Sequence, residues 1–385
     1  MKKIPVEPPI TDYLHRKAAK MKIPLNGTFE LTPLCNMDCK MCYVRMSKEQ
    51  QEMIRPLRTA EEWIQLGKEA KDRGMVYLLL TGGEPFLRPD FKEILQGLHK
   101  MGFVLTINTN GTLIDENVIS WLKETPPVRI NITLYGASDE TYGKLCGNPK
   151  GFTQVTKAIH LLKEAGILVK LNCSLTPYNV CDLEKIFEFA EKEELVVQAT
   201  SYMFPPLRRD EKMVGKNDRF TEKEAAYYAA RVEALQKGEE NFVQHVKEQK
   251  LDGLQIENDD NCLETDDHKI RCRAGKCSFW ITWDGKMFPC GMIIDENARN
   301  VFQDGFDLAW DTVKQKAEVI RLPAKCGSCA LKEQCRACAA MVLTESGNYS
   351  EVPKYRCQMM QEYLTACRIV ADEIENAEMR KCDEK

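Results

Sequence analysis

The stretch Val76-Tyr77-Leu78-Leu79-Leu80-Thr81-Gly82-Gly83-Glu84-Pro85 sets the fold class of this 385-residue chain. Its first five residues are a continuous apolar run, which is what a strand buried on both faces of a parallel sheet requires. Thr81 to Pro85 then end the strand in a turn that contains two glycines. A buried strand followed by such a turn predicts an α/β fold whose functional loops lie at the C-terminal ends of its strands.

Strand and helix patterns alternate on both sides of this stretch. Thr59 and Glu62 form a capping box before a helix that ends near Gly74, and Asp90 with Glu93 is expected to cap the next helix. The expected strands cover residues 29–32, 76–80, 104–107, 130–134, 168–173 and 195–200. Six β/α units joined by right-handed crossovers predict a partial (β/α)6 TIM-like barrel.

Outside the barrel, the patterns divide the chain into further parts. Residues 1–25 are a short lead-in with little core, and residues 26–205 are the barrel. Residues 206–270 form a charged, weakly patterned bridging region, apart from one helix that Thr221 and Glu224 cap. Residues 271–385 form a cysteine-rich domain, in which Asp284-Gly285 predicts a hairpin over 280–288 and an amphipathic helix covers about 358–377.

The composition is that of a globular protein, with 43% hydrophobic and 29% charged residues. A net charge of −4 argues against recruitment by nucleic acid or by an anionic membrane. No run of about 18 apolar residues is present, so no membrane span is expected. The first residues lack the apolar segment of a signal peptide, which predicts a cytoplasmic protein. In that reducing compartment, clustered cysteines are more often metal ligands than disulfides.

Eleven of the 17 cysteines fall into two groups. Cys35, Cys39 and Cys42 directly follow the first strand and therefore lie on the first loop of the barrel mouth. The second group consists of Cys272, Cys277, Cys290, Cys326, Cys329, Cys335, Cys338 and Cys357. Eleven is three plus twice four, and three thiolates leave one iron of a four-iron cluster open to a ligand whereas four close it. The two groups predict three 4Fe-4S clusters, of which one is reactive and two are closed.

Zinc is the alternative metal for both groups. Structural zinc sites take four ligands, whereas the first loop supplies three and the next thiol along the chain is that of Cys146. The C-x2-C pairs of the second group are zinc-like, so one or two zinc knuckles are the alternative there. The joint occurrence of both groups favours iron.

Taken together, these motifs resemble the radical S-adenosylmethionine (SAM) superfamily with a C-terminal SPASM domain, as in peptide-modifying maturases. The resemblance implies that the backbone of Gly82, Gly83 and Glu84 holds the amino group of SAM. It also implies contacts of Asn108, Asn110 and Thr133 with the ribose or the methionine, and of Met41 with the adenine. Where many relatives have Arg-Gly, this chain has Cys146-Gly147, and Lys170 is a candidate for the missing partner of the SAM carboxylate.

The resemblance also implies how the second cysteine group is divided. One auxiliary cluster would take Cys272, Cys277, Cys290 and Cys338, and the other Cys326, Cys329, Cys335 and Cys357. The spacing from Cys335 to Cys338 is one residue shorter than is usual in the family. Because the two sets interleave, metal binding is expected to contribute to the folding of this domain.

The clusters indicate the chemistry. An electron passed into SAM gives a 5′-deoxyadenosyl radical, which takes a hydrogen atom from the substrate. The two closed clusters offer no place for a substrate and are expected to carry electrons, so the prediction is oxidation or cross-linking of a peptide side chain. An external donor of the flavodoxin or ferredoxin type is implied. No protein side chain is assigned as a catalytic acid or base.

Three alternatives stay open at this point. The same radical chemistry could act on a small metabolite. Maturation of sulfatases is disfavoured, because maturases of that type carry Asp after the cysteine matched by Cys290, where this chain has Gly291. The third alternative is not an enzyme: it is a zinc-binding interaction module on an inactive barrel. Since only about 25 residues precede the first expected strand, any leader peptide is expected to be bound by a separate protein or by the bridging region.

Overall fold

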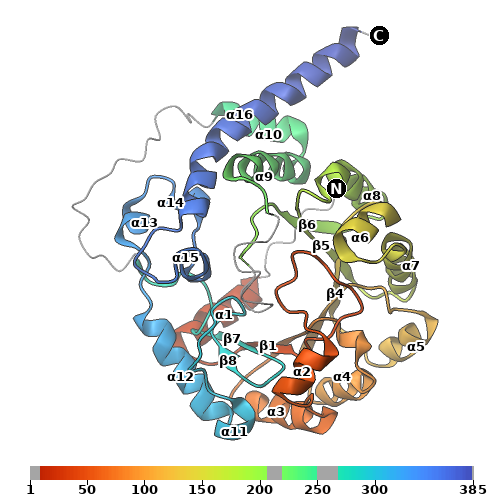
Figure 1. Ribbon diagram of the computed structural model, residues 1–385, viewed down its shortest axis with the longest axis vertical. Helices are drawn as coiled ribbons and strands as arrows, with labels where there is room; N and C mark the ends of the chain where they lie inside the picture. The colour runs from red at the N-terminus through yellow and green to blue at the C-terminus, as the bar shows by residue number, and fades with distance from the viewer. Residues whose placement is uncertain (1–8, 206–218, 249–267, 384–385) are drawn as a thin grey trace.

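The computed structural model describes residues 9–205, 219–248 and 268–383. A single curved sheet of eight strands forms its centre, in the order β6-β5-β4-β3-β2-β1-β7-β8, with helices on its outer side (Figure 1). The strands are β1 (Asn26–Glu30), β2 (Tyr77–Thr81), β3 (Val104–Thr109), β4 (Arg129–Thr133), β5 (Val169–Ser174), β6 (Val196–Thr200), β7 (Ser278–Ile281) and β8 (Met287–Phe288). The sheet is open between β6 and β8, as in a partial barrel.

All six predicted barrel strands are present, and each is parallel to its neighbour. The prediction placed the first strand too late: β1 begins at Asn26 and ends at Glu30, instead of covering residues 29–32. The amide of Leu31 still donates to the carbonyl of Thr81 over 2.8 Å, after which the chain leaves the sheet. The alternating burial of the strands places apolar side chains such as Phe29 and Leu80 beneath the helices.

The helices cover the outer face of the sheet and build the C-terminal region. In the barrel they are α1 (Pro9–Met21), α2 (Lys48–Ile54), α3 (Ala60–Asp72), α4 (Phe91–Lys100), α5 (Glu116–Glu124), α6 (Asp139–Cys146), α7 (Gly151–Glu164) and α8 (Leu183–Lys192), with short 3-10 helices η1 (Pro85–Leu87) and η2 (Val180–Asp182). After the barrel they are α9 (Glu222–Lys237), α10 (Glu239–Glu248), α11 (Val301–Asp304), α12 (Phe306–Val319), α13 (Ala324–Ser328), α14 (Lys332–Cys335), α15 (Ala339–Ser346) and α16 (Lys354–Asp383).

Two of the three predicted helix caps are confirmed. Thr59 and Thr221 each form a complete capping box, at the start of α3 and α9. The predicted cap of α4 is wrong, since the Asp90 side chain accepts no hydrogen bond from the helix. Both of its carboxylate oxygens instead accept from Arg88, over 2.9 and 2.7 Å. A charged donor two residues away thus competes successfully with the helix amides for this carboxylate.

The predicted hairpin is present, but it belongs to the barrel sheet. β7 and β8 are antiparallel, and Gly285 turns between them with a φ of +95°, a backbone conformation that favours glycine. β7 also pairs in parallel with β1, from Asn26 opposite Ser278 to Phe29 opposite Ile281. This pairing, which no local pattern predicts, makes the C-terminal region continuous with the barrel.

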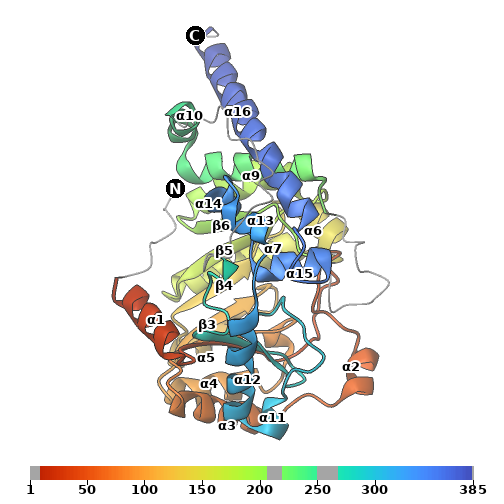
Figure 2. The same cartoon turned by 90° about the vertical axis from the view of Figure 1, so that its left-hand side faces the viewer.

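The bridging region and the tail form one helical layer beside the barrel (Figure 2). Helices α9 and α10 pack against the long helix α16, which is longer than the sequence pattern predicted. The rest of the bridging region, residues 206–218 and 249–267, lies outside the described residues. The lead-in contains helix α1, whose His15 stacks on Tyr77 of β2 with ring centroids 5.2 Å apart.

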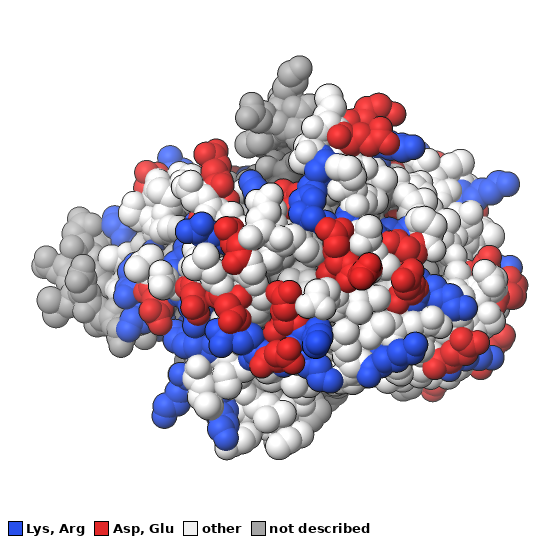
Figure 3. Space-filling view, turned by 90° about the horizontal axis from the view of Figure 1, so that it is seen from below, with Lys and Arg blue, Asp and Glu red and all other residues white. Residues whose placement is uncertain are grey.

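No helix in the described part of the chain is both long and apolar enough to cross a membrane. Figure 3 shows basic and acidic side chains interspersed over the face seen from below, without a large area of one sign. Opposite charges also pair between elements: Arg73, directly after α3, pairs with Asp307 of α12 at 2.6 Å. The strongly one-signed surface that nucleic-acid binding would need is therefore absent from this face.

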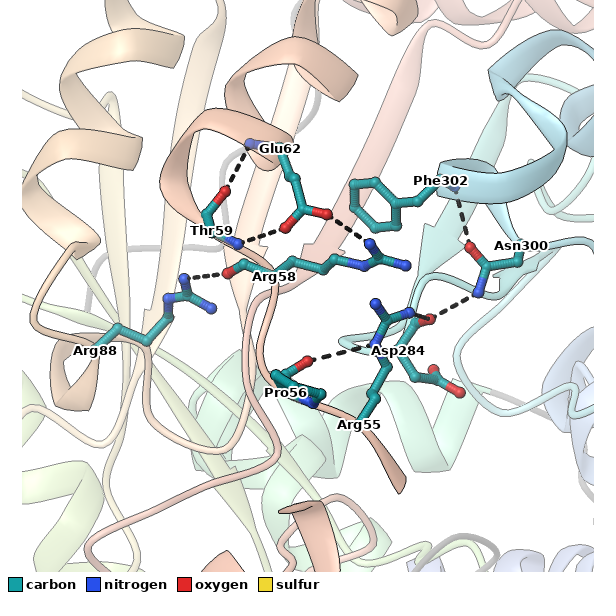
Figure 4. Close-up of polar contacts among 9 residues, drawn as sticks. All are labelled: Arg55, Pro56, Arg58, Thr59, Glu62, Arg88, Asp284, Asn300 and Phe302. Atoms are coloured by element: carbon teal, nitrogen blue, oxygen red, sulfur yellow. Dashed lines mark hydrogen bonds and ion pairs between the residues drawn. The ribbon is translucent and has the colours of Figure 1, made fainter. Parts of the chain in front are cut away.

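A polar network joins the segment before α3 to the C-terminal hairpin (Figure 4). Arg55 donates to the carbonyl oxygen of Asp284 over 3.1 Å, and the Asn300 side chain donates to the same oxygen over 2.9 Å. The guanidinium of Arg58 lies over the Phe302 ring, 4.3 Å from its centroid. Side chains thus reinforce the attachment that β7 makes to β1.

Arg88 is a buried cation that ties three segments together. Its guanidinium donates to the carbonyl oxygens of Leu31 and Arg58, each over 2.7 Å, and pairs with Asp90. Its side chain is only 3% exposed. Because Leu31 begins the loop that carries the first cysteines, this residue helps to fix where that loop leaves the sheet.

We expect Arg88→Met to lower the free energy of unfolding by about 3 kcal/mol, because it leaves a carboxylate and two buried carbonyls without their donor. Denaturant unfolding measures the loss. Arg73→Met is the matched control: it breaks an exposed pair with Asp307, with side chains 43% and 65% exposed, and should cost less than about 1 kcal/mol. Equal losses for the two variants would contradict this role of Arg88.

Candidate active site

The three cysteines of the first group lie on the loop between β1 and α2, at the C-terminal end of β1, and all three are partly buried. The sulfur of Cys35 accepts from the amide of Met37 over 3.4 Å, and that of Cys42 from the amide of Arg45 over 3.3 Å. Amide donors to sulfur stabilise thiolates and tune iron–sulfur centres. The loop therefore presents its sulfurs in the surroundings that a cluster requires.

Helix α6 holds this loop from one side. The amide of Asp38 donates to the carbonyl of Cys146 over 2.9 Å, and the amide of Lys40 donates to that of Leu145 over 3.0 Å. These carbonyls belong to the last turn of α6, which ends at Gly147 with a φ of +67°. The side chain of Cys146 is fully buried and its carbonyl accepts from the cysteine loop, so this residue helps to position that loop.

The glycines after β2 allow two backbones to meet. The amide of Gly83 donates to the carbonyl of Thr32 over 2.6 Å, and the amide of Glu84 to that of Leu34 over 2.8 Å. A Cβ atom on Gly83 would lie 2.3 Å from the Leu34 oxygen, and one on Gly82 would lie 2.6 Å from the Thr32 oxygen. Neither position accepts a side chain, because the end of β2 is pressed against the cysteine loop.

Glu84 is completely buried and binds the end of the next strand. Its carboxylate accepts from the Thr109 hydroxyl over 2.8 Å, from the Asn110 amide over 2.8 Å and from the Phe86 amide over 3.1 Å. Burial raises the pKa of Glu84 to about 7, although these three donors favour the charged form. The carboxylate therefore links the loops that follow β2 and β3, and the backbone around it faces the cysteines.

Asn110 connects the β3 loop to the cysteine loop. The side-chain nitrogen Nδ2 of Asn110 lies 3.7 Å from the Cys35 sulfur and donates to the Asn36 side-chain oxygen over 2.9 Å. Asn36 in turn donates to the Thr112 hydroxyl over 2.8 Å. The sequence analysis did not identify Asn36 or Thr112. Two features could have indicated them: Asn36 lies inside the cysteine motif, and Thr112 follows the Asn-Gly turn at 110–111.

The other predicted SAM contacts lie around the same mouth. Met41 packs against the barrel core beside Cys35 and Cys39. Asn108, two residues before Asn110, accepts from the Asn131 amide over 2.7 Å on the neighbouring strand. The backbone oxygen of Thr133, at the end of β4, accepts from the buried Tyr142 hydroxyl over 3.3 Å. These placements are compatible with contacts to SAM, which stay a prediction, as does the role of Lys170, whose side chain bonds to Gln198.

Groups that would become negative on ionisation are buried close together at this mouth. Burial, helped by the charges of Glu84, Cys39 and Cys42 and opposed by the Met37 amide, raises the pKa of the Cys35 thiol to about 12. Deprotonated cysteines would therefore need a positively charged group among them, and iron supplies that charge. The donor set fits a 4Fe-4S cluster with one open iron. Within the described residues, no three His, Cys, Asp or Glu side chains are close enough to hold a single metal ion.

Four cysteines of the second group line one cavity of about 250 Å³ at the start of α16. They are Cys326, Cys329, Cys335 and Cys357, the set that the family resemblance implied. Burial raises the pKa of Cys326 to about 12, with Cys335, Cys357 and Cys329 adding to the shift through their charge. Four gathered thiols fit a closed cluster.

The other implied set is only partly assembled. Cys338 lies at the start of α15; burial raises its pKa, which the charge of nearby Cys272 also raises, while amides of the helix lower it. Cys290 and Cys338 pack against the same small apolar core. Cys277 is fully buried against Ala18 and Leu25 instead. Cys272 is thus near enough to Cys338 for its charge to act on that thiol, and the complete set of four stays a prediction.

Comparison with known proteins gives matches across most of the chain. Residues 29–190 match the family described as the radical SAM superfamily. The AdoMet-dependent heme synthase of Methanosarcina barkeri is 26% identical over 342 residues, or 85% of this chain and 94% of that protein. The antilisterial bacteriocin subtilosin biosynthesis protein AlbA of Bacillus subtilis is 27% identical over 288 residues, or 74% of this chain and 59% of AlbA. The solved structure of native anSMEcpe with bound AdoMet and Cp18Cys peptide has a TM-score of 0.65 at 17% identity, covering 92% of this chain and 99% of that one.

We expect Glu84→Gln to lower the free energy of unfolding by about 1–3 kcal/mol, because the side-chain NH₂ must face at least one of three N–H or O–H donors. The dissociation constant for SAM, measured by calorimetry on reconstituted protein, should rise with it. Glu93→Gln makes the same chemical change on the exposed face of α4 and should leave both quantities unaltered. Identical behaviour of the two variants would argue against the role given to Glu84.

Proposed function

We propose, from the premise that this chain carries a radical SAM domain and is an enzyme of that superfamily, that it oxidises or cross-links a peptide side chain. The observation that carries the proposal is the pairing of two cysteine sites. Three cysteines surround the barrel mouth, and four more line a single cavity in the C-terminal region. A site that generates a radical and a second site that accepts an electron together suit a net oxidation.

Each part of the barrel mouth has its own task in this proposal. Cys35, Cys39 and Cys42 would hold the cluster, and the backbone around Gly82 and Gly83 would bind the amino group of SAM. When bound, the cluster and SAM supply the electron transfer and the 5′-deoxyadenosyl radical. Met41, which is partly buried against the barrel core, would help to exclude water from the reacting atoms.

The cysteines of the C-terminal region would hold two further 4Fe-4S clusters. The gathered set Cys326, Cys329, Cys335 and Cys357 supports one of them. The influence of the charge of Cys272 on the pKa of Cys338 supports the other, in which Cys277 and Cys290 complete the proposed ligands. Four protein ligands leave no open iron, so these centres would move electrons without binding substrate.

Relatives support a peptide substrate. AlbA is named for the biosynthesis of the bacteriocin subtilosin, and anSMEcpe was solved with a peptide bound. The chain spans 59% of the length of AlbA. We further propose that a leader peptide is bound by a separate protein or by the bridging region. We further infer a cytoplasmic enzyme that receives electrons from an external carrier of the flavodoxin or ferredoxin type.

The geometry around Gly291 argues against the maturation of sulfatases. A Cβ atom at this position would lie 2.7 Å from the indole of Trp280. That indole is held in place, because its N–H donates to the buried carboxylate of Glu30 over 3.0 Å. An aspartate base, which maturases of that type carry here, has no room next to this tryptophan.

A small metabolite is the second candidate substrate. The similarity to an AdoMet-dependent heme synthase along 94% of that protein favours it. Both candidates use the same radical, and they differ in what must fit above the barrel. A zinc-binding interaction module, the third reading, predicts stoichiometric zinc and no iron.

Replacing Cys35, Cys39 and Cys42 together with alanine should abolish the reductive cleavage of SAM while leaving the C-terminal clusters in place. Iron content should fall from about 12 to about 8 atoms per chain, since one cluster of three is lost. Anaerobic reconstitution, iron analysis and chromatography of 5′-deoxyadenosine check both points. Undiminished SAM cleavage in this variant would refute the assignment of the loop.

The substrate class is tested by supplying candidates to the reconstituted enzyme with SAM and dithionite. We expect a short peptide encoded beside the gene to stimulate 5′-deoxyadenosine formation and to lose two hydrogen atoms, as mass spectrometry of the peptide detects. A porphyrin bearing carboxylate side chains is the competing candidate. Stimulation by the porphyrin alone would replace the peptide proposal with the second candidate.

A further inference from the structure

A buried histidine in the C-terminal region has no hydrogen-bonding partner for its ring. His268 is only 6% exposed, and neither Nδ1 nor Nε2 has a partner among the residues that the structure describes. A neutral imidazole always carries one N–H donor and one acceptor nitrogen. Because unpaired polar groups away from water cost free energy, the ring is expected to meet a partner in the working protein.

The nitrogen-bearing edge of this ring faces the turn between Cys326 and Cys329. A Cβ atom on Gly327 would lie 2.4 Å from Cε1, 2.8 Å from Nδ1 and 3.0 Å from Nε2 of His268. These are the three nearest atoms, so the tip of the imidazole, and not its attachment to the backbone, points at the turn. Gly327 and both flanking cysteines line the cavity that holds the four gathered thiols. The ring therefore takes the place that a side chain at position 327 would fill.

The backbone sets the position of His268. Its carbonyl accepts from the Leu322 amide over 2.6 Å, and the next residue, Lys269, forms a β-bridge with Arg321. Leu322 also lines the cavity and lies shortly before α13, the helix that carries Cys326. The histidine is thus attached to the segment that leads into the cysteine turn, and the protein itself holds the ring beside that turn.

Two further buried donors without a partner in the described chain lie beside the cysteines of this region. One is the Tyr349 hydroxyl, and Tyr349 packs against the same small apolar core as Cys290. The other is Nε of Arg356, a residue whose guanidinium also donates to the carbonyl of Cys335. Buried donors that lack acceptors thus recur around the thiols, as expected where the acceptors are the sulfur atoms of metal centres.

We propose that His268 donates a ring N–H to a sulfur of the cluster that Cys326, Cys329, Cys335 and Cys357 would hold, and thereby raises the reduction potential of that cluster. The inference rests on the proposed function, because it takes this cavity to hold a redox centre. A hydrogen bond to sulfur stabilises the reduced, more negative cluster more than the oxidised one. The bond therefore favours the passage of an electron to this centre, in line with its role as the acceptor. His268 acts through the cluster and is a positioning residue.

Packing alone is the competing explanation for the buried ring. In that case the imidazole fills the space beside Gly327, and a buried water molecule satisfies its nitrogens. Removal of the N–H would then leave the reduction potential unchanged, and it would affect the stability of the protein equally with and without iron. A hydrogen bond to the cluster requires the opposite on both points.

The test uses the full-length protein, reconstituted with iron and sulfide, and two variants of one position. His268→Leu removes the N–H and keeps an apolar group, whereas His268→Gln keeps a side-chain N–H. His99→Leu is the matched control, because it makes the same change on a partly exposed histidine of α4. A redox titration followed by electron paramagnetic resonance gives the midpoint potentials. Absorbance measures the release of iron to a chelator, and denaturant unfolding gives the stability of the iron-free proteins.

We expect His268→Leu to lower the midpoint potential of one cluster and to release its iron about tenfold faster than the wild type. The iron-free variant should be at least as stable as the iron-free wild type, because a buried ring without partners has been removed. His268→Gln should recover most of the potential, and His99→Leu should match the wild type throughout. Unchanged midpoint potentials in iron-loaded His268→Leu would overturn the proposal.

If His268→Leu does not load iron into the cavity, a measurement on the wild type decides. Pulsed electron paramagnetic resonance of the reduced protein, grown with isotope-labelled histidine, should detect a histidine nitrogen coupled to a cluster. Absence of that coupling overturns the proposal.

Failure of this inference can be told apart from failure of the proposed function. Cleavage of SAM by the wild type with dithionite tests the radical chemistry without reference to His268. A wild type that cleaves SAM, together with potentials that do not respond to His268→Leu, would remove this inference alone. A wild type that does not cleave SAM would contradict the proposed function, whatever the potentials show.

Discussion

A close contact between two backbones fixes the geometry of the barrel mouth. The amides of Gly83 and Glu84 donate to the carbonyls of Thr32 and Leu34, over 2.6 and 2.8 Å, with no space left for a side chain at Gly83. The same turn delivers Glu84 into the core, where it binds the end of β3. Three strand ends are thereby set relative to one another before any cofactor arrives. The loop that begins at Cys35 takes its position from them.

Burial of groups that must become negative is the second constraint. At the mouth, burial raises the pKa of Cys35, and the charge of Glu84 adds to the rise. In the C-terminal cavity, burial raises the pKa of Cys326, and the charges of three other cysteines add to that rise. Such sites favour neutral thiols until a cation enters, because ionised groups are costly away from water. Metal binding therefore releases protons and contributes free energy to folding. The effect should be largest around α13 and α14, which are short and lie beside a small apolar core.

The parts of the fold that could be predicted are those that local sequence patterns specify. Apolar runs predicted the barrel strands, and Thr59 with Glu62 predicted the start of α3, because both signals act within a few residues. The cap at Asp90 was predicted wrongly, since a buried arginine took the carboxylate. The pairing of β7 with β1 joins residues some 250 apart in sequence, and nothing in either strand specifies its partner.

The same limit applied at the candidate site. The cysteine spacing and the Gly-Gly-Glu turn predicted which segments meet, since each motif is contiguous. Their mutual contacts could not be predicted: Asn36 reaches Asn110 and Thr112, and Cys277 packs against α1. Those outcomes depend on how separate loops are pressed together by the core. A single sequence gives only indirect information on contacts between loops that lie far apart along the chain.

In the proposed function, the union of the barrel and the C-terminal region would bear on electron transfer. The Tyr202 hydroxyl, from the barrel mouth, donates to Glu345 of α15 over 2.5 Å, and the same carboxylate accepts from the Arg356 amide over 3.1 Å. Arg356 precedes a cysteine of the outer cavity, and its guanidinium reaches the carbonyl of another. A shift of the barrel mouth would therefore displace that cavity as well. Rigid coupling of this kind would keep the separation of the two proposed redox sites constant. Because electron transfer falls steeply as that separation grows, the shared sheet and the buried carboxylate of Glu345 would matter to the proposed chemistry.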